Sequence, residues 1–369
     1  MENRERLVIL TTPSRGDGVR LHVERAVDTH GKKMDLLMKQ LPHMETAIET
    51  LRDGTGDILA MSAFDWQHFD TSKLSIAGLL TRKEPTWVLV ADDKPEYLEN
   101  EAVVICDNEL LRRQMRRMRP DIVLKTSAGI ASDVGDLVHF ESLESAERWS
   151  WLEGQRKKGV IDGFIAPRAI HSDYRFKGRR HTLGLQRDSS EQNRERFIPP
   201  PLHGFTLLVT RQGFLPSTIQ GMLDPSAHLA YRLESAMLES LDDDLQPITG
   251  IFVEQRKIST ILKKARENED EIVLNSLTDP EKPTKKALRP GPRVEMMIET
   301  LNPSGTVTAA CERMVITEDS HVGMVNLLRE FIHLITIMTT DHEATKRKIP
   351  GMPDAFSEAS PKLLDFDEN

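Results

Sequence analysis

The stretch "FIPPPLHGFTLLVTRQG", residues 197–213, decides the fold of this chain. Three consecutive prolines end any regular element before it, because proline lacks the backbone N–H that helices and sheets use. The run "FTLLVT" that follows has the composition of a buried strand. We expect it to return to the sheet built by the first strands of the chain, so that the chain crosses between two domains twice, near residues 93–100 and 196–202.

Short apolar runs alternate with helical patterns before this stretch. Strand-like runs are "LVIL" (7–10), "DILAMS" (57–62), "WVLVA" (87–91), "AVVIC" (102–106), "DIVLK" (121–125) and "VIDGFIA" (160–166). Helical spacing of apolar residues fills most of the intervals between them, as in "METAIETLR". Strands that alternate with helices predict α/β layers around a mainly parallel sheet.

From Asp224 onward the regular alternation of strand and helix patterns ends. A strong helical pattern, "PSAHLAYRLESAMLESL", is followed by three strand patterns and a closing helix near residues 321–340. We predict a first domain of residues 1–95 plus 198–222 and a second domain of residues 96–197. The third domain is a small α+β unit of residues 223–342 with a charged insert at 257–292, and residues 343–369 form a polar tail.

Composition excludes several classes of protein. A net charge of −9 argues against nucleic acid and anionic membranes as partners. Two cysteines cannot build a disulfide framework, and none of the twelve histidines has a zinc-site spacing, so we expect no metal. The N-terminus lacks the apolar run of a signal peptide, and no uncharged stretch of eighteen residues occurs. We expect a cytoplasmic monomer.

Four stretches of the sequence, by their order along the chain, resemble the porphobilinogen deaminase (hydroxymethylbilane synthase) family across residues 5–340. They are "ETLRDGTGDILAMSAFDW", "LLRRQMRRMRPDIVLK", "IPPPLHGFTLLVTR" and "SAMLESLDDDLQPITG". The resemblance implies two periplasmic-binding-protein-like domains around a cleft plus a small α+β third domain. It also implies a transferase of haem and other tetrapyrrole biosynthesis that condenses four porphobilinogen units with loss of ammonia, on a cysteine-bound dipyrromethane cofactor.

The resemblance also assigns roles to individual residues. Asp65 falls on the catalytic aspartate of the family; its other interpretation is a strand-end residue that caps the next turn. Arg112 and Arg113 fall on paired arginines that contact cofactor carboxylates, as planar guanidinium groups do well. Their alternatives are a solvated basic helix face or a polyanion-binding patch. The first-strand arginine of the family falls near Thr12, where Arg15 or Arg20 could reach the same space. His203 takes the position of a family glutamine, where it is either a ligand contact or a structural histidine.

Other positions depart from the family pattern. Leu245, within "DDDLQ", stands where the cofactor cysteine belongs, and leucine cannot form a thioether. The turn "DNEL" (107–110) stands where the family has an anion-binding turn, and its two carboxylates, Asp107 and Glu109, would repel anionic groups. Cys106 and Cys311 lie in strand contexts, away from the cofactor loop, where a small core thiol is the ordinary role. We therefore predict that dipyrromethane is absent.

Two hypotheses follow, and whether the protein is an enzyme stays open between them. The first is a diverged hydroxymethylbilane synthase that uses Asp65. The second is a catalytically inactive paralogue, a pseudoenzyme, that uses the cleft to bind a protein partner or a small anionic ligand, such as porphobilinogen or another carboxylate. The loss of the cysteine and of most arginines favours the second, since each missing charge-assisted contact costs about 1.5–3 kcal/mol.

Overall fold

The structure is a computed structural model that describes residues 6–13, 16–83, 85–174, 176–185, 195–278, 291–340 and 362–367. It contains three sheets, and the chain divides into two compact units. The first unit holds residues 1–107, 122–184 and 201–235. The second holds residues 108–121, 185–200 and 236–369. The domain boundaries expected from the sequence stay predictions.

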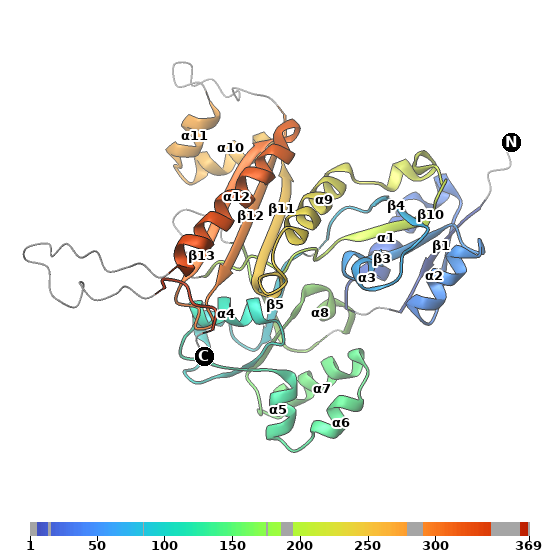
Figure 1. Cartoon of the computed structure of the whole chain (residues 1–369). Helices are drawn as coiled ribbons and strands as arrows, with labels where there is room; N and C mark the ends of the chain where they lie inside the picture. The colour runs from blue at the N-terminus through green and yellow to red at the C-terminus, as the bar shows by residue number, and fades with distance from the viewer. Residues whose placement is uncertain are drawn as a thin grey trace, which may run out of the picture. The chain divides into compact units, whose positions relative to one another are not determined.

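The first sheet has the strand order β2-β1-β3-β10-β4. Its strands are β1 (Leu7–Thr11), β2 (Leu36–Gln40), β3 (Ile58–Ser62), β4 (Leu74–Leu79) and β10 (Thr206–Arg211). Its helices are α1 (Val19–Met34), α2 (Met44–Arg52), α3 (Ala63–His68) and the 3-10 helix η3 (Pro216–Met222). β10 runs antiparallel between β3 and β4, and Figure 1 shows this yellow-green strand among the blue ones. The expected return of the chain to the first sheet is thus observed.

The second sheet has the order β7-β6-β8-β5-β9. Its strands are β5 (Trp87–Ala91), β6 (Val103–Ile105), β7 (Val123–Lys125), β8 (Gly163–Pro167) and β9 (Arg179–Thr182). Its helices are η1 (Pro95–Tyr97), α5 (Ser127–Asp133), α6 (Leu137–Ser142), α7 (Ser145–Lys157) and α8 (Arg168–Tyr174). β6 pairs in parallel with both of its neighbours, and β5 is antiparallel to β8.

The two sheets share one plan. In the first sheet β1 lies between β2 and β3, and the antiparallel β10 follows β3. In the second sheet β6 lies between β7 and β8, and the antiparallel β5 follows β8. Residues at alternate positions of β1, β3 and β10 fill one face of the first sheet, where Ile9, Ile58 and Leu208 pack against Val19 and Val23 of α1. This arrangement confirms the prediction of an α/β protein with two periplasmic-binding-protein-like domains.

The third sheet is antiparallel, in the order β11-β12-β13. Its strands are β11 (Thr249–Arg256), β12 (Arg293–Leu301) and β13 (Thr308–Ile316). The remaining helices are α4 (Glu109–Met118), α9 (Pro225–Glu239), η4 (Gln246–Ile248), α10 (Ile258–Glu267), α11 (Glu271–Leu277), η5 (Thr317–Asp319) and α12 (Ser320–Thr339). Every residue of β12 is buried, as the central position of this strand requires.

The structure describes parts of the charged insert and of the polar tail. Residues 258–277 form α10 and α11, and α10 buries Ile261, Leu262 and Ala265, so this part of the charged insert still supplies an apolar helix face. Leu364 of the tail is fully buried, and its N–H donates to the carbonyl of Met338 at 2.9 Å. Residues 279–290 and 341–361 lie outside the described residues.

One helical stretch among the described residues, Thr317–Thr339, is long and apolar enough to cross a membrane by length and composition alone. The core helix of a soluble protein passes the same test, but such a helix is mostly buried, whereas this window is 33% buried. Within it, α12 buries Leu327 and Phe331 and lays Gly323 against Val315 of β13. This packing is that of a helix covering a sheet.

A buried ion pair holds the proline-led return loop in the first unit. Arg82 donates to both carboxylate oxygens of Glu234 on α9, at 2.6 and 3.2 Å, and to the carbonyl of His203 at 2.9 Å. The N–H of Leu202 donates to the same carboxylate at 2.8 Å, and the Arg82 guanidinium stacks 3.9 Å from the centroid of the Phe205 ring. Glu234 is fully buried, so these donors replace its water.

We expect Glu234→Ala to lower the free energy of unfolding by about 3–5 kcal/mol, because it leaves the Arg82 guanidinium buried without its counter-charge. Urea denaturation of the two proteins measures this. The control is Glu24→Ala, which removes a half-exposed pair with Arg20 and should cost less than about 1 kcal/mol. Equal losses in the two variants would contradict a structural role for the buried pair.

Candidate functional site

Polar side chains gather where β1, β3 and β10 end or begin, at one edge of the first sheet. Strand alternation places Thr11, Ser62 and Thr206 on the face that α1 covers, one step beyond the apolar residues of the core. Thr206 is paired with Ser62 across the β3–β10 ladder, and its hydroxyl lies 2.9 Å from Nδ1 of His22 on α1. All three hydroxyl-bearing residues are buried.

This edge is a position where α/β sheets bind ligands. The chain leaves β1 toward β2 on one side and later enters β3 on the other, so the carboxyl ends of β1 and β3 border a topological switch point. Crevices at such points are the usual ligand sites of open α/β sheets. Thr11 ends β1, and Ser62 ends β3.

Asp65, the residue singled out from the sequence, lies at this edge. It stands in the first turn of α3, directly after β3, and it is 4% exposed. The Ser62 hydroxyl donates to its Oδ2 at 2.9 Å, and its own N–H donates to Ser62 Oγ at 3.0 Å. The serine is therefore the residue that caps α3, and Asp65 is held by that cap. A catalytic role for Asp65 stays a prediction.

A second carboxyl group, Asp17, lies close enough to Asp65 for the two charges to interact. Asp17 precedes α1, and its Oδ1 accepts the N–H of Val19 at 3.0 Å. Burial raises the pKa of Asp17 to about 6, and the negative charges of Asp65 and Asp173 add to this, while the Val19 N–H opposes it. Asp173 belongs to α8, so the group draws on helices of both sheets of the first unit.

The loop before α1 is packed tightly against α8. Gly16 adopts a φ of +82°, and a Cβ at this position would lie 2.2 Å from Cγ1 of Ile170. Only glycine meets both conditions. Asp17 therefore stands between two glycines with positive φ, and a Cβ at Gly18 would make a tight contact of 3.1 Å with Cβ of Ala169.

Two buried polar atoms at this edge have no hydrogen-bond partner among the described residues. They are the hydroxyl oxygen of Thr11 and Nε2 of His22. Thr11 is fully buried and His22 is 5% exposed. Burial lowers the pKa of His22 to about 4, with help from the charges of Arg25 and Lys83, so the ring is neutral near pH 7. Buried polar groups are seldom left unpaired, so these atoms indicate a place for a ligand or water.

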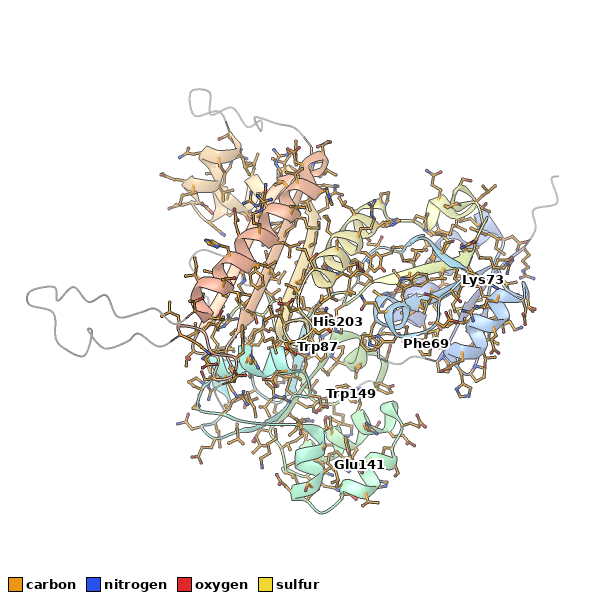
Figure 2. The ribbon with its side chains drawn as sticks, in the orientation of Figure 1. Phe69, Lys73, Trp87, Glu141, Trp149 and His203 are labelled. Atoms are coloured by element: carbon orange, nitrogen blue, oxygen red, sulfur yellow. The ribbon has the colours of Figure 1, made fainter. Side chains whose placement is uncertain are left out.

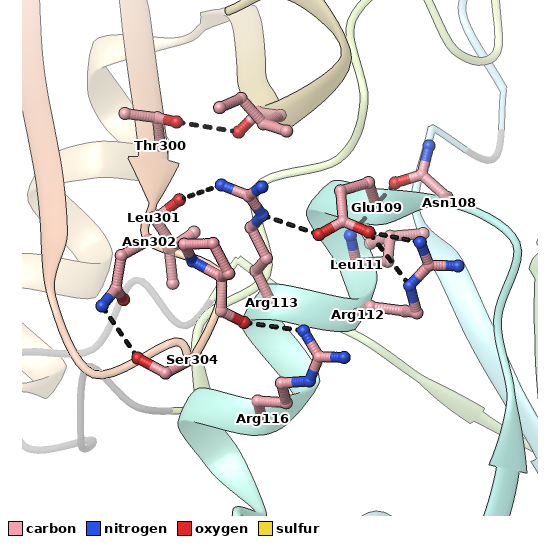
Figure 3. Close-up of polar contacts among 12 residues, drawn as sticks. Asn108, Glu109, Leu111, Arg112, Arg113, Arg116, Thr300, Leu301, Asn302 and Ser304 are labelled. Atoms are coloured by element: carbon pink, nitrogen blue, oxygen red, sulfur yellow. Dashed lines mark hydrogen bonds and ion pairs between the residues drawn. The ribbon is translucent and has the colours of Figure 1, made fainter. Parts of the chain in front are cut away.

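Arg112 and Arg113, expected to bind anions, are engaged elsewhere. Both donate to the carboxylate of Glu109 on their own helix, and Nη1 of Arg113 donates to the carbonyl of Leu301 on β12 at 2.7 Å (Figure 3). Arg116 donates to the carbonyl of Pro303 at 2.6 Å. The structure thus places the arginine helix against the C-terminal sheet, and a ligand-binding role for the pair stays untested.

A buried ion pair continues this contact between α4 and β12. Arg117 Nη1 lies 2.9 Å from Oε2 of Glu299, and Gln114 donates to the other oxygen of that carboxylate at 3.0 Å. Glu299 is 2% exposed. A Cβ at Gly305, in the turn after β12, would lie 2.5 Å from the carbonyl oxygen of Arg113, so the turn seats directly on α4. Sequence reasoning missed this role because helical arginines signal charge and not a partner.

The other sequence candidates are scattered. His203 is half-buried, its ring meets Trp87 edge-on at 4.9 Å (Figure 2), and burial lowers its pKa to about 4. Leu245 precedes η4 in a turn, where its N–H donates to the carbonyl of Asp242. Cys106 is buried at the end of β6, and Cys311 is half-buried on β13, where burial raises its pKa. Arg15 lies outside the described residues. The predicted absence of dipyrromethane stays a prediction.

Metal ligands do not cluster in the part of the chain that the structure describes. No group of three or more His, Cys, Asp or Glu side chains there is arranged to hold a metal ion.

Comparison with known proteins gives no family for this chain. No family model and no curated protein matches it. Similar solved structures include a periplasmic substrate-binding protein of an ABC transporter from Coxiella burnetii (12% identity, 60% of this chain and 94% of that one, TM-score 0.35) and lipoprotein Tp32 from Treponema pallidum (12%, 64% and 96%, 0.35). A third is the periplasmic VFT2 domain of BvgS from Bordetella pertussis (15%, 67% and 92%, 0.31).

These findings correct three expectations. The structural neighbours are periplasmic substrate-binding proteins and lipoproteins, so the assignment to porphobilinogen deaminase was wrong, and tetrapyrrole and haem biosynthesis is withdrawn with it. The prediction of a cytoplasmic protein is contradicted by the same neighbours. Shared order of short motifs misled us because a common fold imposes a common order of strands and helices. Of the two functional hypotheses, a small ligand held by a bilobal fold agrees better with the comparisons.

We expect Asp17→Asn to stabilise the protein at pH 7 by about 1–3 kcal/mol, since an ionised Asp17 is penalised by burial. The folded pKa lies above the unfolded one, so this penalty is absent below about pH 4, grows as pH rises to about 6, and is constant above. Urea denaturation of both proteins at pH 4, 5, 6 and 7 gives the difference, in which the contribution of His22 cancels. A difference that does not change with pH would refute the assignment.

We expect Arg113→Ala to lower the free energy of unfolding by about 1.5–3 kcal/mol, because the Leu301 carbonyl and Glu109 lose a charged donor. Denaturant titration measures the loss. Arg266→Ala, at an exposed position of α10, is the matched control and should change stability by less than about 0.5 kcal/mol. If Arg113→Ala behaves like this control, the guanidinium is a surface group.

Proposed function

We propose that this protein binds a small organic molecule that presents a cationic group to Asp17 and Asp65 at the switch point of the first sheet. The observation that carries the proposal is the pair of buried atoms without a partner among the described residues, Thr11 Oγ1 and His22 Nε2, at the same edge of the sheet as Asp65. A ligand that supplies hydrogen bonds to them would remove a desolvation penalty that the free protein bears.

The charge of the site supports a cation over the anion expected from the sequence. The charges of Asp65 and Asp173 both act on Asp17, and a ligand with a carboxylate would add another negative charge beside Asp17. His22 does not offset these charges near pH 7, because burial keeps its ring neutral. An ammonium or guanidinium group would neutralise them and donate to two carboxylates at once.

The local fold supports binding over a purely structural role. The hydroxyl groups of Ser62 and Thr206 already hold Asp65 and His22 in place, so the polar atoms are fixed before any ligand arrives. Preorganised groups cost little ordering entropy on binding. A structural network of this kind would instead be expected to pair all of its own members.

A panel of small molecules tests the proposal. We expect putrescine and agmatine to raise the melting temperature and to bind in isothermal titration calorimetry, and succinate to do neither. Asp65→Asn should weaken binding by about 10–100-fold, the equivalent of one charge-assisted hydrogen bond. Asp53→Asn, at the exposed end of α2, is the matched control and should bind like the unaltered protein.

The pH dependence provides a second readout in the same experiment. Affinity for the cation should rise as pH increases from 5 to 7, because Asp17 ionises near pH 6. Asp17→Asn should remove this rise. Binding of succinate alone, or cation binding that is indifferent to Asp65→Asn, would overturn the proposal.

A further inference from the structure

A separate cavity of about 290 Å³ lies within the second-sheet domain. It is lined by Asp107, Ser127, Ala128, Phe140, Arg148, Trp149 and Leu152. This volume is just below the usual range for ligand pockets, about 300–1,000 Å³. None of its residues belongs to the first-sheet site, so the cavity is a second place for a ligand, beyond the proposed function.

The fold places the cavity where a parallel sheet ends. Asp107 and Ser127 follow the adjacent parallel strands β6 and β7, and the N–H of Cys106 donates to the carbonyl of Lys125 at 2.9 Å to continue their pairing. Both residues therefore emerge side by side at the carboxyl edge of the sheet, the edge at which ligands of α/β sheets are bound.

Asp107 is a fixed carboxylate on the rim of the cavity. The N–H of Ser127 donates to its Oδ1 at 2.7 Å, and the Ser127 hydroxyl donates to its Oδ2 at 2.5 Å. Each oxygen keeps a second lone pair for another donor. Asp107 itself is exposed while Ser127 is buried, so the carboxylate is held by a buried residue and is still accessible to solvent.

Arg148 is a fixed cation on the same rim. Its Nε donates to the carbonyl of Leu143 and its Nη2 to that of Glu141, each at 3.0 Å, and its guanidinium lies 5.3 Å from the centroid of the Phe140 ring. Both acceptors are backbone carbonyls, so the positive charge is not cancelled. Among the described residues, neither Asp107 nor Arg148 forms an ion pair.

The floor of the cavity is apolar. Trp149 and Leu152 are one helical turn from each other on α7, and Phe140 and Leu152 are almost fully buried. Trp149 packs near Phe164 of β8, with ring centroids 6.1 Å apart, and Figure 2 labels its position. An apolar floor beneath two charges of opposite sign fits a ligand that carries a cationic group, an anionic group and an apolar side chain.

We propose that this cavity binds a small zwitterion with an apolar side chain, in the class of the aliphatic α-amino acids. Its ammonium group contacts Asp107, its carboxylate contacts Arg148, and its side chain lies on Phe140, Trp149 and Leu152. A molecule with only one of the charges leaves the opposite rim group without a partner, and a molecule without the side chain leaves the floor in water.

Isothermal titration calorimetry with four probes tests this proposal. L-Leucine carries all three groups. Glycine lacks the apolar side chain, 3-methylbutan-1-amine lacks the carboxylate, and 4-methylpentanoate lacks the ammonium group. We expect L-leucine to bind at least tenfold more tightly than each of the others. No detectable binding of L-leucine at 10 mM, or equal affinity for the amine, overturns the proposal.

Variants assign the two charges. Arg148→Gln should weaken L-leucine at least tenfold and leave the amine unchanged, and Asp107→Asn should weaken L-leucine and leave 4-methylpentanoate unchanged. Lys158→Gln and Asp93→Asn, at exposed positions of the same domain, are matched controls that should bind normally. Because Asp107 also holds Ser127, Arg148→Gln decides the outcome if the aspartate variant does not fold. Unchanged L-leucine affinity in Arg148→Gln refutes the site.

Asp65→Asn separates this site from the one at the first sheet. It should weaken binding of putrescine by about 10–100-fold and leave the L-leucine titration as it is. Loss of L-leucine binding in Asp65→Asn would show that the amino acid occupies the first-sheet site, which refutes the second-sheet cavity as its place.

Discussion

The fold of the first unit depends on one buried charge pair, Arg82 with Glu234. Two strands that are far apart in the sequence, β4 and β10, lie next to each other, and the loops that follow or precede them must be fixed at the same place. Glu234 does this by accepting from Arg82 and from the backbone of the proline-led loop at once. A fully buried carboxylate tolerates few alternatives to these partners, so the pair selects one path for the chain.

The same constraint connects the fold to the candidate ligand site. β10 begins at Thr206, just after the loop that Arg82 holds, and Thr206 is the residue that orients His22. The register of β10 against β3 also sets Thr206 opposite Ser62, which in turn holds Asp65. The arrangement of the polar side chains at this edge therefore depends on β10, and the start of β10 is fixed by an ion pair that lies outside the site.

Periodicity and turn residues were enough to predict the α/β layers and the return strand, because burial of apolar faces leaves few alternatives. Asp65 was singled out through the resemblance to porphobilinogen deaminase, and its position directly after a buried strand is what brings it to this edge. Asp17 and His22 were missed, since their partners are hydroxyl and charged groups on elements remote in sequence. The contacts of the α4 arginines were not foreseen for a physical reason: a guanidinium that binds an anion and one that donates to a backbone carbonyl, as Arg113 does, look alike in sequence.

The docking of α4 on β12 has a consequence for biosynthesis. Arg113 and Leu301 are 188 positions apart, so at common elongation rates roughly 10–40 s pass between the appearance of the helix and that of its strand. During this time an arginine-rich helix, destined to be buried, has emerged from the ribosome without its acceptor. Docking of α4 must therefore await the synthesis of β12, and until then the nascent chain offers a chaperone a long-lived basic segment.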